Sequence, residues 1–164
     1  MEEKYSIGII VDRTGSVITE KKMLEASINI IIEALYNNYP LSLEKKIIIT
    51  YLGEEDLLLQ VQNNKDFNLN ITKLKRDLKK ESIFELFEKI AIEKGNKKIF
   101  LFSDGYLIEE NNWEKFIISL KSKKEFNEIE KIAIGIGEGF NETILKKFSS
   151  IEKVFQYRDV YNLV

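Results

Sequence analysis

The sequence contains no histidine and no cysteine among its 164 residues. Without them the chain cannot build the usual nitrogen- and sulfur-ligated zinc site. It also lacks the serine–histidine–aspartate and cysteine–histidine systems of covalent catalysis, and the most common general base is missing. A functional site must therefore consist of carboxylates, hydroxyls, lysine, tyrosine and backbone groups, which favours hard-metal binding or phosphate chemistry.

Arginine and a strong charge of one sign are also lacking. Arginine occurs only at positions 13, 76 and 158, and the formal net charge is −2. Proteins that read nucleic acids rely on clustered arginine and a basic surface. The lysines here are instead spread along helix-like segments together with glutamate, which is typical of solvated faces. We therefore expect no nucleic-acid partner.

Long hydrophobic runs are absent, because no apolar stretch approaches the length of a membrane span. The first residues, Met-Glu-Glu-Lys, lead directly into a strand-like segment and do not resemble a secretion signal. A hydrophobic content of 44% and a charged content of 32% are typical of a soluble globular protein. We expect a single domain over residues 1–164, located in the cytoplasm and without membrane contact.

Apolar runs of strand length alternate with segments of helical periodicity, which favours an α/β fold. The predicted strands span residues 5–11, 46–52, 56–62, 98–102, 131–136 and 154–157. The predicted helices span about 19–38, 71–79, 82–94, 112–126 and 141–149. Right-handed crossovers would place helices on both faces of the sheet. The expected architecture is a doubly wound three-layer sandwich around about six mainly parallel strands.

One edge of this sheet is expected to be antiparallel. The turn Gly53-Glu54-Glu55 separates the predicted strands 46–52 and 56–62. So short a link cannot hold a crossover helix, and it therefore favours a hairpin. A polar connection, residues 63–70, follows this hairpin.

The most informative motif is Asp12-Arg13-Thr14-Gly15-Ser16, which follows the apolar run Ile7–Val11. A strand that is apolar throughout is buried on both faces. Ligands of open α/β sheets bind beyond the carboxyl ends of such strands. Asp104 follows a second run of this kind, Ile99–Ser103. Carboxylates and hydroxyls at this edge are hard oxygen ligands that suit Mg²⁺, Mn²⁺ or Ca²⁺.

These segments resemble the metal-ion-dependent adhesion site of the von Willebrand factor A (vWA) domain family. That family carries Asp-x-Ser-x-Ser on a first loop, threonine on a second, and aspartate, usually Asp-Gly, on a third. The matching positions are Asp12-Arg13-Thr14-Gly15-Ser16, Ser82 and Asp104-Gly105. Thr14 stands where the family usually has serine, and Ser82 stands where it usually has threonine. Lys79-Lys80-Glu81 stands where Gly-Gly is common.

The resemblance covers nearly the whole chain, and within the family it is strongest to the bacterial tellurite-resistance-associated type. The stretch Tyr39-Pro40-Leu41-Ser42-Leu43-Glu44 before the second strand is similar to that group. The same holds for Ile132-Ala133-Ile134-Gly135-Ile136-Gly137, which is followed by a helix and a short strand.

The resemblance implies a protein-binding module, not an enzyme. The implied metal ligands are Asp12, Thr14, Ser16, Ser82 and Asp104. They would hold Mg²⁺, or Mn²⁺ or Ca²⁺, and an acidic side chain of a partner protein would replace one water on the ion. Arg13 and Tyr106 would lie at the rim where the partner docks. No small-molecule substrate is expected.

Other interpretations of the same residues stay open. Asp12 could cap a turn or the next helix, and Ser82 could be a plain helix N-cap, with Glu81 as the neighbouring candidate ligand. Asp12 with Thr14 also resembles Asp-nucleophile phosphatases, which would make the chain a Mg²⁺-dependent phosphate-handling enzyme. Those enzymes need a second acidic residue nearby, and Thr14 breaks that pattern. Arg13 could simply be solvated, and the fold could serve as a metal-free scaffold.

Overall fold

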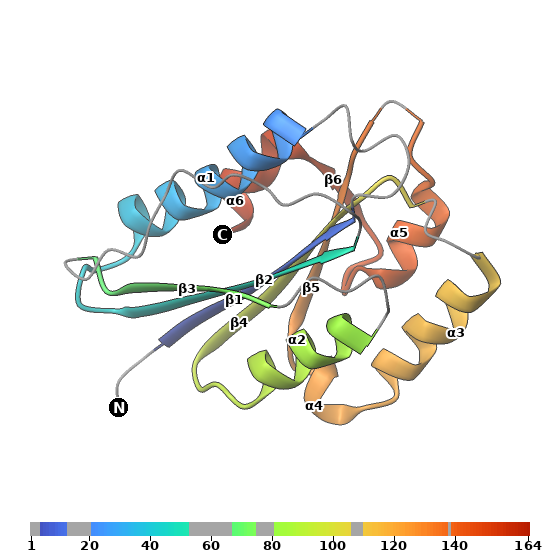
Figure 1. The fold of residues 1–164 in the computed structure, drawn as a ribbon, viewed down its shortest axis with the longest axis horizontal. Helices are drawn as coiled ribbons and strands as arrows, with labels where there is room; N and C mark the ends of the chain where they lie inside the picture. The colour runs from blue at the N-terminus through green and yellow to red at the C-terminus, as the bar shows by residue number, and fades with distance from the viewer. Residues whose placement is uncertain (1–3, 13–20, 53–66, 75–80, 106–109, 138) are drawn as a thin grey trace.

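The computed structural model describes residues 4–12, 21–52, 67–74, 81–105, 110–137 and 139–164. The strands are β1 (Lys4–Asp12), β2 (Glu44–Leu52), β3 (Leu69–Lys73), β4 (Asn96–Ser103), β5 (Glu130–Gly135) and β6 (Val154–Gln156). They form one sheet in the order β3-β2-β1-β4-β5-β6, and every neighbouring pair is parallel (Figure 1). The predicted α/β class and the parallel sheet are confirmed.

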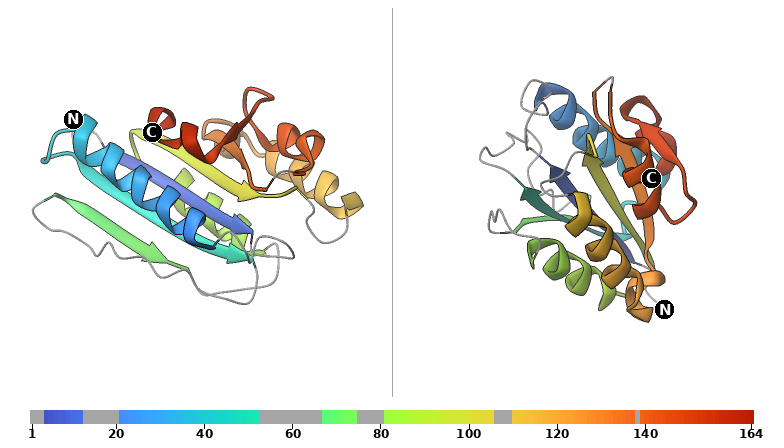
Figure 2. Two further views of the ribbon diagram at one scale, coloured as in Figure 1. Left: turned by 90° about the horizontal axis from the view of Figure 1, so that it is seen from above. Right: turned by 90° about the vertical axis from the view of Figure 1, so that its right-hand side faces the viewer.

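Helices cover both faces of the sheet. They are α1 (Lys21–Asn38), α2 (Glu81–Ala91), α3 (Glu110–Lys121), α4 (Lys124–Asn127), α5 (Glu142–Phe148), the 3₁₀ turn η2 (Tyr157–Asp159) and α6 (Val160–Leu163). Helices α1 and α6 lie on one face, and α2, α3, α4 and α5 lie on the other (Figures 1 and 2). The three-layer sandwich is therefore confirmed. No helix in these described ranges is long and apolar enough to cross a membrane.

Strand β1 is buried on both faces, as its apolar run Ile7–Val11 predicts. Ile7 and Ile9 belong to the core cluster beneath α1, whereas Ile10 belongs to the cluster beneath α2. All three side chains are fully buried. The central strand that ends in Asp12 is thus held between two apolar layers, which makes its carboxyl end a rigid platform.

The edge formed by β3 differs from the prediction. β3 runs parallel to β2, with Leu69 opposite Lys45, so the antiparallel edge strand is not seen among the described residues. The helix predicted over 71–79 is wrong for Ile71–Lys73, which belong to β3. Residues 53–68 separate the two strands, and about a dozen residues suffice for a parallel crossover. The strand predicted at 56–62 lies outside the described residues.

The carboxyl-terminal third contains two features that periodicity did not predict. The helix predicted over 112–126 is divided, because α3 ends at Lys121 and the Asn127 side chain donates to the Lys121 carbonyl at 2.7 Å. After β6 the chain turns through η2 into α6, which packs on α1. The Asn37 amide donates to the Tyr161 hydroxyl at 3.2 Å, and the Lys98 ammonium donates to the Leu163 carbonyl at 2.8 Å.

Two lysines are buried near the amino ends of their strands. Lys45, in β2, is fully buried, and its ammonium donates hydrogen bonds of 2.8–2.9 Å to the backbone carbonyls of Pro40, Leu43 and Phe67. Lys131, in β5, donates to the carbonyls of Phe126 and Ile129 at 2.6 and 3.1 Å. Each ammonium satisfies carbonyls at the end of a loop or helix, so these cations are structural.

Candidate functional site

Strands β1 and β4 lie side by side at the centre of the sheet, where the strand order reverses. From β1 the chain proceeds through β2 to β3 at one edge, and from β4 it proceeds through β5 to β6 at the other. Open α/β sheets bind ligands at such a switch point, beyond the carboxyl ends of the strands. Asp12 is the last residue of β1, and Asp104 directly follows β4.

The strand register places these two aspartates at the same end of the sheet. Val11 lies opposite Phe102 in the parallel β1–β4 pair. Asp12 comes one residue after Val11, and Asp104 comes two residues after Phe102. Neighbouring strands lie about 4.8 Å apart. The backbones at positions 12 and 104 are therefore adjacent at the carboxyl edge.

The amino terminus of α2 reaches the same edge. Glu93 follows shortly after the end of this helix at Ala91, and its carboxylate lies 2.6 Å from the Lys46 ammonium and 3.7 Å from the Lys4 ammonium. Both lysines are near the amino ends of their strands, so α2 runs from the carboxyl edge back to the amino edge. Its first residues, Glu81 and Ser82, thus begin the helix on the side of Asp12 and Asp104.

Asp104 is held in a turn that a fourth segment supports. The residue is 7% exposed, and its backbone carbonyl accepts a hydrogen bond of 2.7 Å from the backbone N–H of Asn141. The Gly105 N–H donates to the buried Ser103 hydroxyl at 3.0 Å. Asn141 also begins α5, because its side-chain oxygen accepts from the Ile144 N–H. The turn after β4 is therefore tied to the start of α5.

Gly105 is required by this arrangement. Its φ is +79°, a left-handed conformation that disfavours residues with a side chain. A Cβ at this position would lie 2.7 Å from the Asn141 carbonyl oxygen and 2.9 Å from the Asn141 Cβ. The Asp104-Gly105 pair is thus explained by a close approach of two loops, whatever the site binds.

The structure describes the predicted site residues to different extents. Asp104 is described in full, whereas only the backbone is described for Asp12, Glu81 and Ser82. The remaining predicted residues, Arg13, Thr14, Ser16 and Tyr106, lie outside the described residues. Within the described part of the chain, no three His, Cys, Asp or Glu side chains form a cluster that could hold a metal ion. The predicted set has only two carboxylates, with hydroxyls as its other donors.

Residue 141 was predicted to begin a helix over 141–149, and Asn141 is indeed the N-cap of α5. Its contact with Asp104 was not predicted. The contact joins residues that are distant in the sequence, so periodicity could not reveal it. The available signal was the pair of glycines, Gly105 and Gly137, which both adopt positive φ in these two loops.

No protein-family model matches the sequence, and a comparison with curated proteins finds no match. The solved structures that are similar include two that align with 98% of this chain. Proximal thread matrix protein 1 from the mussel byssus has a TM-score of 0.58 at 14% identity. The ArnB paralog VWA2 from Sulfolobus acidocaldarius has a TM-score of 0.57 at 18% identity. The chain spans 44% of the length of each. The likeness shows the fold alone, and the fold is vWA-like.

Proposed function

We propose that this chain, with its vWA-like fold, is a protein-binding module that recognises an acidic side chain of a partner protein through a divalent ion. The observation that carries the proposal is the pairing of β1 with β4. Two adjacent parallel strands at the switch point of the sheet lead directly into Asp12 and Asp104. Ligand sites of open α/β sheets are found at this position.

The chemistry of the donor set supports a hard cation. Asp12, Thr14, Ser16, Ser82 and Asp104 would hold Mg²⁺, or Mn²⁺ or Ca²⁺, and all five carry only oxygen donors. The Asp104 turn is preorganised for this role, because the backbone hydrogen bond from Asn141 and the conformation of Gly105 fix its path. A metal-binding residue whose backbone is already ordered loses less conformational entropy when the ion binds.

The neutral hydroxyls explain how such a site would favour an acidic partner. When bound, the ion supplies a positive centre with exchangeable waters. Hydroxyl ligands leave more of the ion's charge available to a partner carboxylate than further carboxylate ligands would. Arg13 and Tyr106 would contact the partner at the rim. The proposal includes no catalytic step.

Isothermal titration calorimetry with MgCl₂ and MnCl₂ tests the metal site. We expect saturable binding by the wild type and its loss in Asp12→Ala and Asp104→Asn. Glu128→Gln is the matched control, because it removes an exposed carboxylate near the end of α4. At a concentration 100-fold above the Kd, the ion should add about 2.7 kcal/mol to the unfolding free energy. Equal, negligible heats in all four proteins would refute the metal site.

A second measurement tests the partner chemistry. Titration of ¹⁵N-labelled protein with N-acetyl-aspartate amide should shift the amide resonances of Gly105 and Asn141 in Mg²⁺ but not in EDTA. Shifts of equal size in EDTA would show that the carboxylate does not bind through the ion. Turnover of p-nitrophenyl phosphate that Asp12→Asn abolishes would support the phosphate-handling alternative instead. Thermal stability indifferent to EDTA, in a protein that binds no Mg²⁺, would support the metal-free scaffold.

We also propose that the chain is of the bacterial tellurite-resistance-associated type and acts in the cytoplasm. Two sequence stretches, residues 39–44 and 132–137, support this assignment. The first leads into β2 and ends at Glu44, the first residue of that strand, and the second contains most of β5. Fractionation of the source cells tests the location, since recovery in a membrane or secreted fraction would contradict it.

A further inference from the structure

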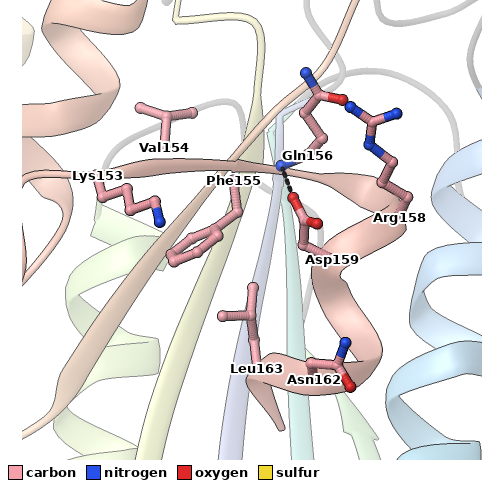
Figure 3. Close-up of a pocket in the computed structure, with 8 residues that line it drawn as sticks. All are labelled: Lys153, Val154, Phe155, Gln156, Arg158, Asp159, Asn162 and Leu163. Atoms are coloured by element: carbon pink, nitrogen blue, oxygen red, sulfur yellow. Dashed lines mark hydrogen bonds between the residues drawn. The ribbon is translucent and has the colours of Figure 1, made fainter.

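A pocket of about 370 Å³ lies beside the edge strand β6, between that strand and the η2–α6 segment (Figure 3). β5 separates β6 from β4 in the sheet, so the pocket is apart from the switch point between β1 and β4. None of its lining residues belongs to the predicted metal site. The pocket therefore needs its own explanation.

The lining combines an apolar floor with a cation at each end. Phe155 and Leu163 are half-buried, and Figure 3 shows Lys153 on one side of the Phe155 ring and Arg158 on the other. The Lys153 ammonium lies 4.9 Å from the centre of that ring. In the part of the chain that the structure describes, neither cation has a carboxylate within ion-pair distance. By contrast, Lys98 is paired with Glu130 at 3.7 Å.

Among the described residues that line the pocket, Asp159 alone carries a carboxylate, and it has a structural role. Its Oδ2 atom accepts a hydrogen bond of 3.0 Å from the backbone N–H of Gln156, drawn as the dashed line in Figure 3. This N–H is therefore not available to an added strand, and β6 has only 3 residues. A ligand beside β6 must be bound mainly through its side chains, and extension of the sheet is disfavoured.

The charge of the lining is opposite to that of the whole chain. Lys153 and Arg158 against Asp159 leave a net charge of +1 at the pocket, whereas the chain carries −2. A positive patch on an acidic protein attracts and orients anionic partners. The apolar floor adds a requirement that free inorganic anions do not meet, because burying Phe155 and Leu163 needs an apolar group.

We propose that this pocket binds an extended acidic peptide of a partner protein, in which an apolar residue is flanked by acidic ones. In an extended chain, side chains two residues apart point the same way. A central leucine or phenylalanine would pack on Phe155 and Leu163, and its acidic neighbours at two residues' distance would pair with Lys153 and Arg158. This binding needs no metal ion, so it is independent of the proposed carboxyl-edge site.

Fluorescence anisotropy on the full chain in EDTA tests the proposal. The probe is fluorescein-labelled Gly-Glu-Ala-Leu-Ala-Glu-Gly, with one matched peptide that carries lysine for glutamate and another that carries serine for leucine. We expect saturable binding of the probe alone. The double variant Lys153→Glu/Arg158→Glu should weaken it by at least about tenfold, because two attractions become repulsions.

The matched control is Lys115→Glu/Lys124→Glu, which changes the net charge equally at exposed positions on α3 and α4. It should bind the probe like the wild type. Circular dichroism checks that both variants fold. If Lys153→Glu/Arg158→Glu does not fold, Lys153→Gln/Arg158→Gln takes its place. The proposal is refuted by no saturable binding, by an equal loss in the control, or by binding of the serine peptide as tightly as the probe. Sedimentation equilibrium offers a further test. If the wild type and the control variant form a dimer and the Lys153/Arg158 variant does not, the pocket binds a second copy of this chain, and the proposal is refuted.

Discussion

Substitution of Gly105 by alanine tests whether close packing against Asn141 positions Asp104. At a φ of +79° an L-residue costs about 1–2 kcal/mol relative to glycine. The added Cβ would also lie 2.7 Å from the Asn141 carbonyl oxygen, which is backbone and cannot rotate away. Moving the two loops apart adds a cost of about 1–3 kcal/mol, typical of overpacking. We expect Gly105→Ala to lower the unfolding free energy by about 2–5 kcal/mol.

The matched control is Gly139→Ala in the loop that leads to Asn141. Gly139 is exposed, its φ is not left-handed, and an added Cβ would meet no atom within 4 Å. Its stability should change by no more than about 0.5 kcal/mol. Urea unfolding followed by circular dichroism measures both unfolding free energies, and thermal melts should show a fall of roughly 4–20 °C for Gly105→Ala alone. Equal stabilities for the two variants would refute the loop contact and, with it, the preorganisation of Asp104.

Three further predictions concern buried or paired charges. Lys45→Met should lower the unfolding free energy in urea by about 1–3 kcal/mol, because three carbonyls lose their donor; an unchanged value would contradict this. Burial lowers the pKa of Lys131 from 10.5 to about 8, so the unfolded chain binds more protons and stability should rise between these pH values. Lys131→Met should remove that rise in pH-dependent urea unfolding, and parallel curves would refute it. The hydrogen bond from Lys46 lowers the pKa of Glu93 below 4.5, so this contribution to stability is lost as pH falls through that region. Glu93→Gln should flatten the acid limb of thermal melts, and an equally steep limb would contradict the role of the pair.

The central strands of the sheet were predictable because they are buried on both faces. β1 and β4 are central strands, so composition alone marks them as apolar runs. β3 has the sequence Leu-Asn-Ile-Thr-Lys, and most of its side chains are at least partly exposed. An edge strand of this kind is defined by its pairing with β2, because β-propensity depends strongly on cross-strand packing and burial. α6 was not predicted because its 4 residues are too few to show helical periodicity.

For the candidate site, the sequence alone determined the chemistry. The absence of histidine and cysteine, together with Asp12 and Asp104 after two apolar runs, restricts the donors to oxygen and places them at strand ends. Only the tertiary structure decided which loops meet there. Asn141 reaches Asp104 because β5 pairs with β4, and Lys153, Arg158 and Leu163 share one pocket because α6 folds back beside β6. Such contacts depend on the order of the strands and the direction of the crossovers, which no local pattern of residues encodes.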